Sequence, residues 1–334
     1  MKNTNLIIGK KGIGKTTGLM FKKIKELISN NDNLLIVDNK EEYYKTYAEE
    51  LKNKGYNVCV INFKNPNNSN GFNPLLMPYK LYKEGNKDTV IKIVSNFSKS
   101  IMHKQDAMDP FWTDSAASYL TGLILTLFKE GKEEEINLGS IQVMISKIEN
   151  DIEKFREYIN KLDLVSPEYI YLSTVVNAPN ETRGGIVSVL KMELTKYISA
   201  ENLLNMLSIN DVDLTIDEKT AIFVIGNEDY NKLTNMVISE VINSNNKFTY
   251  ILDNFDSLNK IIELGDLLEE DNKVFIISRN IDSIKEKYGK YIEDKFDEVK
   301  IIENEENLEK IGNYDKYPTL ENHQNKYYNL DNIL

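Results

Sequence analysis

Gly9-Lys10-Lys11-Gly12-Ile13-Gly14-Lys15-Thr16 is the stretch of sequence that decides the fold. It follows the apolar run Leu6-Ile7-Ile8 and leads into an amphipathic segment, residues 18–29, so a strand, a glycine-rich loop and a helix are expected in that order. GxxxxGK[ST] in this context is the P-loop, or Walker A, signature of phosphate binding. An ordinary glycine turn is the alternative interpretation, but it does not explain the lysine and threonine that close the loop.

The residue types of this loop suit a bound phosphate group. Glycines let backbone N–H groups turn inward around the anion, where a β-carbon would obstruct them, and the helix that follows directs the positive end of its dipole there. Lys15 is expected to reach the β- and γ-phosphates, and the Thr16 hydroxyl to bind Mg²⁺. We therefore expect ATP and Mg²⁺ as ligands, with the nucleotide bound by Gly9, Gly12, Ile13, Gly14, Lys15, Thr16 and Thr17.

Composition indicates a globular chain without a membrane span. Of the 334 residues, 41% are hydrophobic and 28% charged, and no apolar run approaches the ~18 residues of a spanning helix. Cys59 is the only cysteine, which excludes an internal disulfide and is typical of cytosolic proteins. The net charge of −11 disfavours a protein that coats DNA nonspecifically, because such proteins present basic patches. We expect a cytoplasmic protein whose nucleic-acid contacts are local.

Strand patterns surround a long helical region. After the P-loop, strands are expected at 33–38 and 57–63 with a helix at 41–54 between them, which favours a parallel sheet with right-handed crossovers. Strand patterns return at 220–225, 248–253, 273–278 and 298–302. Between them, helices are expected at 89–102, 110–128, 140–160, 168–176 and 182–199. The expected parts are an α/β nucleotide-binding domain at 1–85 and 206–312, an all-helical insert at 86–205 and a polar tail at 313–334.

A second chemical element is Tyr250-Ile251-Leu252-Asp253, an apolar strand that ends in aspartate. In a P-loop protein such an aspartate helps to hold the metal, so Asp253 joins Thr16 as a candidate Mg²⁺ ligand. Its alternative role is to cap the following helix. Asp38 is a rival, because it also ends a strand beside the P-loop, where it can orient a water molecule or contact Lys40.

Several further motifs, in the same order along the chain, resemble the ATPase part of type IV secretion coupling proteins, the conjugative DNA-transfer motors of mobile elements. Residues 38–42 (DNKEE) resemble the family's aspartate-proline-lysine-glycine-glutamate segment, with the proline and glycine lost. Residues 71–75 (GFNPL) resemble its asparagine-proline motif, and residues 109–112 (DPFW) match its helix-opening motif. Residues 219–225 (KTAIFVI) resemble the strand after its insert.

This resemblance implies a RecA-like P-loop ATP hydrolase that translocates DNA. It also implies a homo-oligomeric ring with nucleotide at the subunit boundaries, and type IV secretion or conjugation components, DNA or a relaxase–DNA complex as partners. No counterpart of the membrane-spanning N-terminal region of many members is found, so membrane association is expected only through a partner. The alternatives are a nucleotide-gated assembly or binding subunit with little turnover, and a small-molecule kinase, which the long insert and the lack of an arginine-rich lid disfavour.

Position 254 departs from the family pattern of Asp-Glu, since this chain has Asp253-Asn254. That glutamate would polarise the attacking water. Asparagine can position water but cannot accept its proton, so a contribution of roughly 10²–10⁴-fold is expected to be missing. Asp256, Glu41 and Glu42 are the candidates to replace it.

Two arginines are candidates for charge stabilisation. Arg183 lies at the return from the helical insert, and Arg279 stands where the family carries a glutamine at a strand end. In ring motors an arginine from one subunit can stabilise phosphate charge in its neighbour. A salt-bridged surface arginine is the alternative for each.

The insert motif also has a structural interpretation. Asp109 is expected to cap a helix with Pro110 in its first position. Phe111 and Trp112 are then expected to be core anchors, because aromatic residues act mostly through buried area.

Overall fold

The computed structural model describes residues 3–102, 109–212, 214, 219–244, 246–304, 307–321, 323–331 and 333–334. They form two compact units. Unit 1 comprises residues 1–70 and 211–320, and unit 2 comprises residues 71–210 and 321–334. The sequence predicts domain boundaries at 85/86 and 205/206, whereas the two units divide at 70/71 and 210/211. The segment predicted to be a polar tail is divided between the two units.

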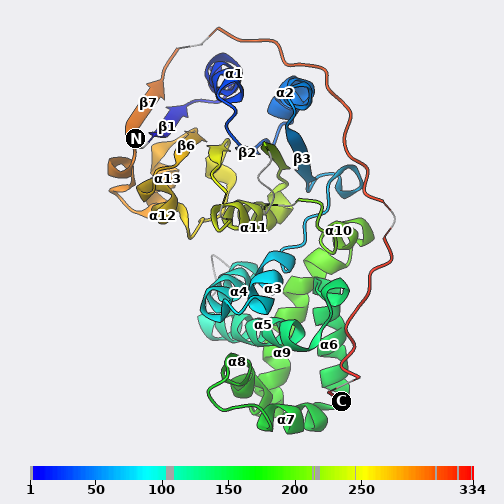
Figure 1. Ribbon diagram of the computed structural model, residues 1–334. Helices are drawn as coiled ribbons and strands as arrows, with labels where there is room; N and C mark the ends of the chain where they lie inside the picture. The colour runs from blue at the N-terminus through cyan, green and yellow to red at the C-terminus, as the bar shows by residue number, and fades with distance from the viewer. Residues whose placement is uncertain are drawn as a thin grey trace. The chain divides into compact units, whose positions relative to one another are not determined.

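Unit 1 is built on a sheet of seven strands (Figure 1). The strands are β1 (Asn3–Gly9), β2 (Leu34–Val37), β3 (Asn57–Asn62), β4 (Thr220–Ile225), β5 (Thr249–Leu252), β6 (Lys273–Ser278) and β7 (Glu298–Ile302). Their order is β3-β4-β2-β5-β6-β1-β7, and each neighbouring pair is parallel. The expected α/β fold with a parallel sheet is therefore confirmed.

Helices cover both faces of this sheet, as parallel sheets require. The P-loop leads into η1 (Lys15–Met20), a π-helical turn, which continues as α1 (Phe21–Ser29). α1 and α2 (Glu42–Asn53) lie on one face, and α11 (Asn231–Ile242), α12 (Leu264–Glu269) and α13 (Ile281–Tyr288) lie on the other. Short 3₁₀ turns complete the unit at η2 (Pro66–Asn68), η4 (Glu228–Tyr230), η5 (Phe255–Ser257) and η6 (Ile292–Lys295).

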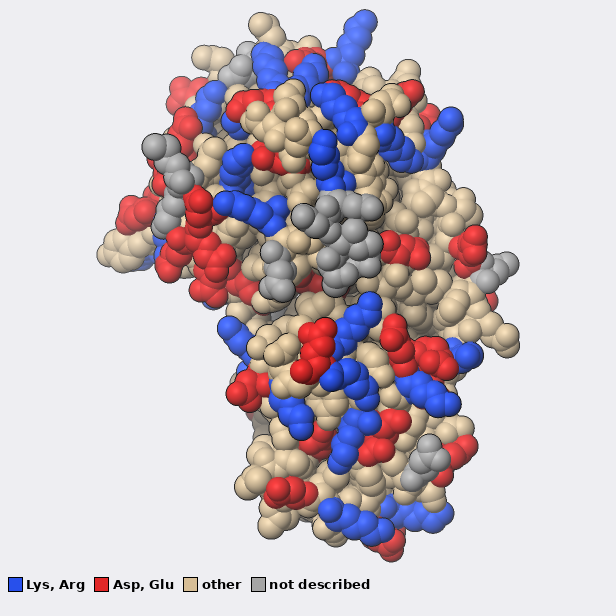
Figure 2. All heavy atoms as spheres, viewed as in Figure 1, with Lys and Arg blue, Asp and Glu red and all other residues tan. Residues whose placement is uncertain are grey.

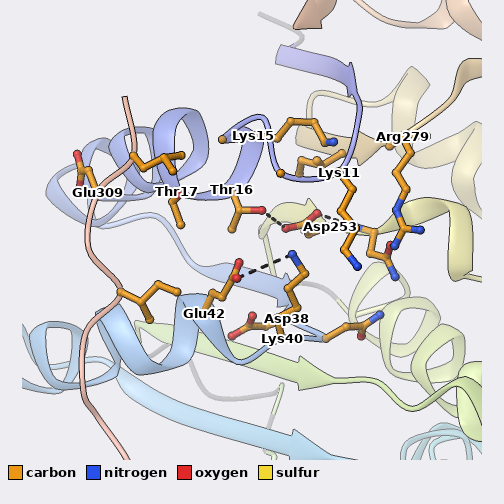
Figure 3. Close-up of a pocket in the computed structure, with 18 of the residues that line it drawn as sticks. Lys11, Lys15, Thr16, Thr17, Asp38, Lys40, Glu42, Asp253, Arg279 and Glu309 are labelled. Carbon is orange, nitrogen blue, oxygen red and sulfur yellow. Dashed lines mark hydrogen bonds and ion pairs between the residues drawn. The ribbon is translucent and has the colours of Figure 1, made fainter. Parts of the chain in front are cut away.

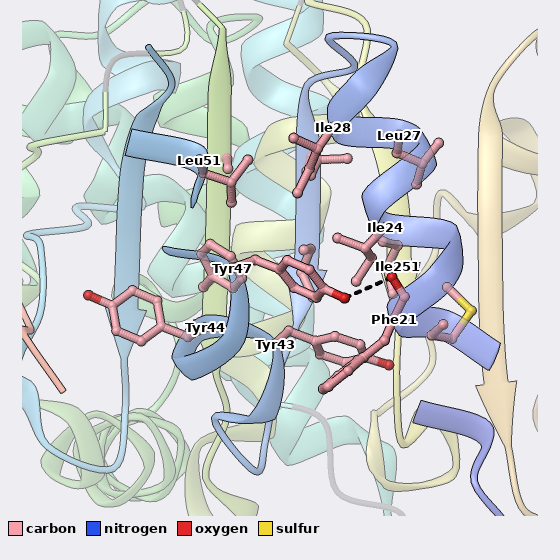
Figure 4. Packing of buried hydrophobic residues seen from close by; sticks show 14 of the residues in the cluster. Phe21, Ile24, Leu27, Ile28, Tyr43, Tyr44, Tyr47, Leu51 and Ile251 are labelled. Carbon is pink, nitrogen blue, oxygen red and sulfur yellow. Dashed lines mark hydrogen bonds between the residues drawn. The ribbon is translucent and has the colours of Figure 1, made fainter. Parts of the chain in front are cut away.

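The core under α1 and α2 is unusually aromatic (Figure 4). Tyr43, Tyr44 and Tyr47 of α2 are almost fully buried, as is Phe21 of α1. The rings of Phe21 and Tyr47 meet edge-on, with centroids 5.4 Å apart, and the Tyr47 hydroxyl donates to the Phe21 carbonyl oxygen at 2.8 Å. A buried phenol normally needs such a partner. This packing locks the P-loop helix against α2, and so fixes the segment before α2 relative to the loop.

Glu240 of α11 makes the stability of unit 1 depend on pH. Its side chain is buried, and burial raises its pKa from 4.5 to about 8. Between these values the unfolded chain has lost this proton while the folded chain keeps it, so the free energy of unfolding falls as pH rises, by about 1.4 kcal/mol per pH unit at most. Burial of Asp38, whose pKa rises to about 7, acts in the same direction.

Glu240→Gln is therefore expected to flatten part of this pH dependence, because glutamine has no proton to lose. Urea unfolding of wild type and variant at pH values from about 5 to about 9 measures the effect. The variant should gain stability relative to wild type toward the alkaline end. Parallel curves for the two proteins would contradict the prediction.

Unit 2 is all helical in its described residues. Its helices are α3 (Leu76–Lys83), α4 (Lys87–Met102), α5 (Pro110–Glu130), α6 (Leu138–Asn150), α7 (Ile152–Asn160), α8 (Pro167–Val176), α9 (Asn180–Ile198) and α10 (Glu201–Met206), with a 3₁₀ turn η3 (Glu133–Glu135). α5 is the central helix, buried almost throughout residues 116–128 and packed against α4, α8 and α9. None of the described helices combines the length and hydropathy that crossing a bilayer requires.

The helix expected at 140–160 is wrong, because the structure has two helices there. Asp151 leaves helical geometry, with φ −144° and ψ 71°. Its carboxylate accepts a hydrogen bond from the backbone N–H of Lys154 at 3.2 Å, which caps α7. The hydrophobic periodicity continues across this break, so the pattern alone did not reveal it.

The DPFW motif opens α5, but its aromatic residues are not core anchors. Asp109 caps the helix as expected, accepting from the Phe111 N–H at 2.9 Å, with Pro110 in the first turn. Phe111 and Trp112, however, are 50% and 37% exposed. Their rings meet edge-on at 5.3 Å, and a Cβ on Gly185 of α9 would come within 2.6 Å of the Trp112 ring. The motif therefore places an aromatic pair at the surface of unit 2.

The C-terminal segment packs on both units. Residues 307–320, here called the strap, follow β7 and pass over the α1 and α2 side of the sheet (orange to red in Figure 1). The last residues belong to unit 2, where Tyr328 and Leu330 are buried. The Tyr328 N–H donates to the Ser140 hydroxyl at 2.9 Å.

Candidate nucleotide-binding site

A pocket of about 740 Å³ in unit 1 collects most of the candidate residues (Figure 3). Its walls are the P-loop after β1, residues 38–40 and 42 after β2, residues 253, 254 and 256 after β5, and residues 277–279 at the end of β6. The strap supplies the last wall, residues 308–311. Parallel strands bring their carboxyl ends to one edge of the sheet, which is where α/β proteins bind ligands.

The P-loop has the backbone geometry of a phosphate cradle. Gly12 and Gly14 adopt φ values of 89° and 84°, which favour glycine. The Gly14 carbonyl accepts from the N–H groups of both Gly18 (2.7 Å) and Leu19 (3.2 Å), so the first helical turn is of π type, a distortion common at functional sites. Ile13 packs against the core cluster. The loop is thus anchored while its backbone faces the pocket.

Lys15 lies where a phosphate-binding lysine is expected. Its ammonium group donates to the carbonyl oxygens of Gly9 and Lys10, the latter at 2.8 Å. Burial lowers the pKa of Lys15, against the opposing effect of Asp253. Phosphate oxygens are charged acceptors and form stronger hydrogen bonds with an ammonium group than neutral carbonyls do. A bound polyphosphate can therefore replace these carbonyl oxygens as the hydrogen-bond acceptors of Lys15.

Thr16 and Asp253, the two candidate metal ligands, are hydrogen-bonded to each other. The Thr16 hydroxyl donates to one Asp253 carboxylate oxygen at 2.9 Å (Figure 3). The described residues contain no cluster of three or more His, Cys, Asp or Glu side chains able to hold a metal. One hydroxyl and one carboxylate nevertheless suit Mg²⁺, which keeps several waters and takes phosphate oxygens as ligands. The residues present fit this ion.

Tyr43 is a site residue that the sequence analysis missed. Its hydroxyl donates to the same Asp253 oxygen at 2.9 Å. Burial, reinforced by the Asp253 charge, raises the pKa of Tyr43 well above its ordinary value, so it remains a donor. A tyrosine on the apolar face of a helix looks like a core residue in the sequence, and only the proximity of α2 to β5 shows its second contact.

Asn254 and Arg279, which end different strands, are hydrogen-bonded to each other. The Arg279 guanidinium donates to the Asn254 side-chain oxygen at 2.8 Å, and the Asn254 amide donates to the Ser257 hydroxyl at 2.8 Å. Arg183 belongs to unit 2 and is not among the described residues that line this pocket. Its guanidinium donates to the Asn180 side chain at 2.7 Å and to the Ala178 carbonyl at 3.3 Å.

Asp256, one candidate replacement for the missing glutamate, is committed to other contacts. It accepts hydrogen bonds from the Ser278 hydroxyl (2.5 Å), the Arg279 N–H (2.7 Å) and the Ser283 hydroxyl (2.7 Å). Burial alone would raise the pKa of Asp256, but these hydrogen bonds outweigh it and hold the pKa below its ordinary value. The carboxylate is thus a weak base that joins β6 to α13.

Glu41 is occupied as well. It has φ 64°, at the position where the resembling family segment carries glycine. Its carboxylate accepts from the Tyr317 hydroxyl at 2.6 Å and pairs with Lys45 at 3.3 Å. Burial would raise the pKa of Glu41, but these partners lower it below its ordinary value.

Glu42 is a pocket carboxylate that is only partly buried and has a raised pKa. Figure 3 shows it directed toward Thr16 and Asp253. Burial raises its pKa, and the Asp253 charge adds to this, against the opposing effect of Lys40 at 3.8 Å. A raised pKa makes a carboxylate a stronger general base. Asp38, the rival metal ligand, is buried and accepts from the Tyr44 N–H at 2.8 Å, so it also helps to start α2.

Comparisons with known proteins agree with this arrangement. The family described as "Type IV secretory system Conjugative DNA transfer" matches residues 3–262. No curated protein matches the chain. The solved structures that are similar in fold include two of the bacterial conjugative coupling protein TrwBdeltaN70, each at 13% identity.

The unbound monoclinic form gives a TM-score of 0.55 over 87% of this chain and 65% of that one. The trigonal form in complex with sulphate gives 0.57 over 89% and 68%. This chain thus spans about two thirds of the length of its structural relative. The structures support the fold, and the family match covers most of the sequence, so the chain belongs to the conjugative DNA-transfer family of type IV secretory systems.

Proposed function

We propose that this protein is a Mg²⁺-dependent ATP hydrolase of the coupling-protein type, which drives the transfer of DNA or nucleoprotein in conjugation or type IV secretion. The observation that carries the proposal is the meeting of Lys15, Thr16 and Asp253 at one pocket. Family membership supplies the biological setting.

Each residue has a defined role in this proposal. The P-loop N–H groups and Lys15 bind the phosphates, and Thr16 and Asp253 hold the metal, which would neutralise charge on the phosphate oxygens. Tyr43 positions the Asp253 carboxylate through its hydrogen bond. Glu42 orients the attacking water and accepts its proton, and Arg279, which also lines the pocket, stabilises developing negative charge.

The proposed assembly is a homo-oligomeric ring, in which Arg183 is a candidate for contact with a neighbouring subunit. DNA or a relaxase–DNA complex and type IV secretion components are the proposed partners, reached from the cytoplasm, with a partner protein providing any membrane attachment. Basic and acidic side chains are intermixed over the face shown in Figure 2. A chain with net charge −11 would therefore contact DNA through a limited set of lysines.

A nucleotide-gated assembly subunit with little turnover is the second candidate. Asn254 favours it, because an amide replaces the carboxylate of the family pattern and is held by Arg279. In this case nucleotide binding, and not hydrolysis, would control the partner interactions.

Phosphate release from MgATP, with and without single-stranded DNA, separates the two candidates. Wild type should release phosphate, and Asp253→Asn should do so at least roughly tenfold more slowly, a barrier difference of about 1.4 kcal/mol. Glu157→Gln, at an exposed carboxylate of α7, is the control and should match wild type. Intact ATP binding without any release by wild type would favour the assembly subunit.

A further inference from the structure

The strap closes one side of the nucleotide pocket, although it comes from the far end of the chain. Leu308, Glu309, Lys310 and Ile311 line the same pocket as the P-loop. The Glu309 N–H donates to the Thr17 carbonyl oxygen at 3.2 Å. The Glu309 carboxylate pairs with Lys25 of α1 at 2.6 Å. The strap is thus tied to the helix that follows the P-loop.

A second set of contacts fixes the strap on α2. The Gly312 N–H donates to the Thr46 hydroxyl, and the Tyr314 N–H to the Lys45 carbonyl oxygen, both at 3.1 Å. A Cβ on Gly312 would lie 2.5 Å from that carbonyl oxygen, so this close approach requires glycine. The Tyr317 ring stacks on Tyr44 with centroids 4.7 Å apart. The strap is therefore held at Glu309 and again at Gly312, Tyr314 and Tyr317.

Two apolar side chains beside these anchors are left exposed. Leu308 is 60% and Ile311 44% exposed, in a pocket whose other walls carry mostly charged and polar residues. Large apolar side chains at a pocket that binds a polar group indicate a ligand with an apolar part as well. In a nucleotide, the phosphates are charged and the base has apolar faces.

We propose that the strap forms the base subsite of the nucleotide pocket, with Leu308 and Ile311 packed against a purine ring. The proposal rests on the proposed function, since it takes the phosphates to lie at the P-loop. The anchors at Glu309 and Gly312 hold the two side chains at a set distance from the loop. The strap thereby makes the pocket recognise a nucleoside triphosphate in preference to a bare polyphosphate.

Binding of two ligands by calorimetry tests the subsite. MgATP carries the base, whereas inorganic tripolyphosphate with Mg²⁺ offers only the phosphate chain. The double variant Leu308→Ala with Ile311→Ala should bind MgATP at least roughly fivefold more weakly, because it loses apolar contact area, and should bind tripolyphosphate as wild type does. Leu164→Ala with Ile170→Ala is the matched control, since these residues are 65% and 56% exposed on unit 2.

The possible results are distinguishable. Equal weakening of both ligands would show that the strap supports the phosphate site and would overturn the base subsite. Unchanged binding of both would overturn it as well, while leaving the proposed function intact. Failure of wild type to bind either ligand would overturn the proposed function and the subsite together. Circular dichroism of the double variant establishes that the fold is retained.

Discussion

The Lys15→Ala variant is expected to bind MgATP roughly tenfold or more weakly than wild type, because a hydrogen bond to a charged group contributes about 1.5–3 kcal/mol. The fold should survive. Among the described residues, the Lys15 ammonium group donates to the carbonyl oxygens of Gly9 and Lys10 in its own loop, and hydrophobic contacts hold the core beneath. Isothermal titration calorimetry measures the affinity, and circular dichroism measures the fold.

Lys22→Ala provides the control for this experiment. Lys22 is exposed on α1, within the same charged segment, and does not line the pocket. Its replacement should leave the affinity for MgATP unchanged. If Lys15→Ala also bound MgATP like wild type, the phosphate site proposed here would be in the wrong place.

Slow ATP hydrolysis by the wild type, relieved in Asn254→Glu, is the second expected result. A glutamate at this position can accept the proton of the attacking water, and a gain of roughly tenfold corresponds to about 1.4 kcal/mol of barrier. ATP affinity should change little, since this group acts mainly in the transition state. The residual turnover of wild type is expected to fall further in Glu42→Gln, because Glu42 is a pocket carboxylate with a raised pKa that, unlike Asp38, is not fully buried.

Asp256→Ala and Glu41→Ala are the comparisons that decide between these bases. Both carboxylates have lowered pKa values and several hydrogen-bond partners, so their loss should affect packing more than water activation. Phosphate release and ATP affinity are to be measured for all four variants. Robust hydrolysis by wild type that disappears in Asp256→Ala or Glu41→Ala would contradict this account and identify a relocated base.

The strands and the P-loop could be predicted from sequence because their signals are local. All six residues of β4 and all four of β2 are buried, and buried parallel strands appear as continuous apolar runs. Thr16 and Asp253 could be paired before the structure, because strand ends in a parallel sheet share one edge. The structure adds their hydrogen bond.

Other features depend on contacts between distant residues. Tyr317 and Glu41 are separated by 276 positions, and the strap has no periodicity that would indicate its course. The exposure of Phe111 and Trp112 could not be predicted either, because large aromatic residues are usually buried and only the packing of α5 against α9 decides otherwise. The break at Asp151 was hidden because apolar residues recur on both sides of it.

Trp112 has a practical consequence for spectroscopy. It is the only tryptophan in the chain and belongs to unit 2, whereas the residues that line the nucleotide pocket belong to unit 1. Selective excitation of tryptophan fluorescence therefore observes one unit without the other, while far-ultraviolet dichroism observes both. Coincidence of the two signals during denaturation is the test of whether the units melt as one cooperative body. A change in tryptophan emission on adding nucleotide would show that binding to the pocket of unit 1 alters the surroundings of Trp112 in unit 2.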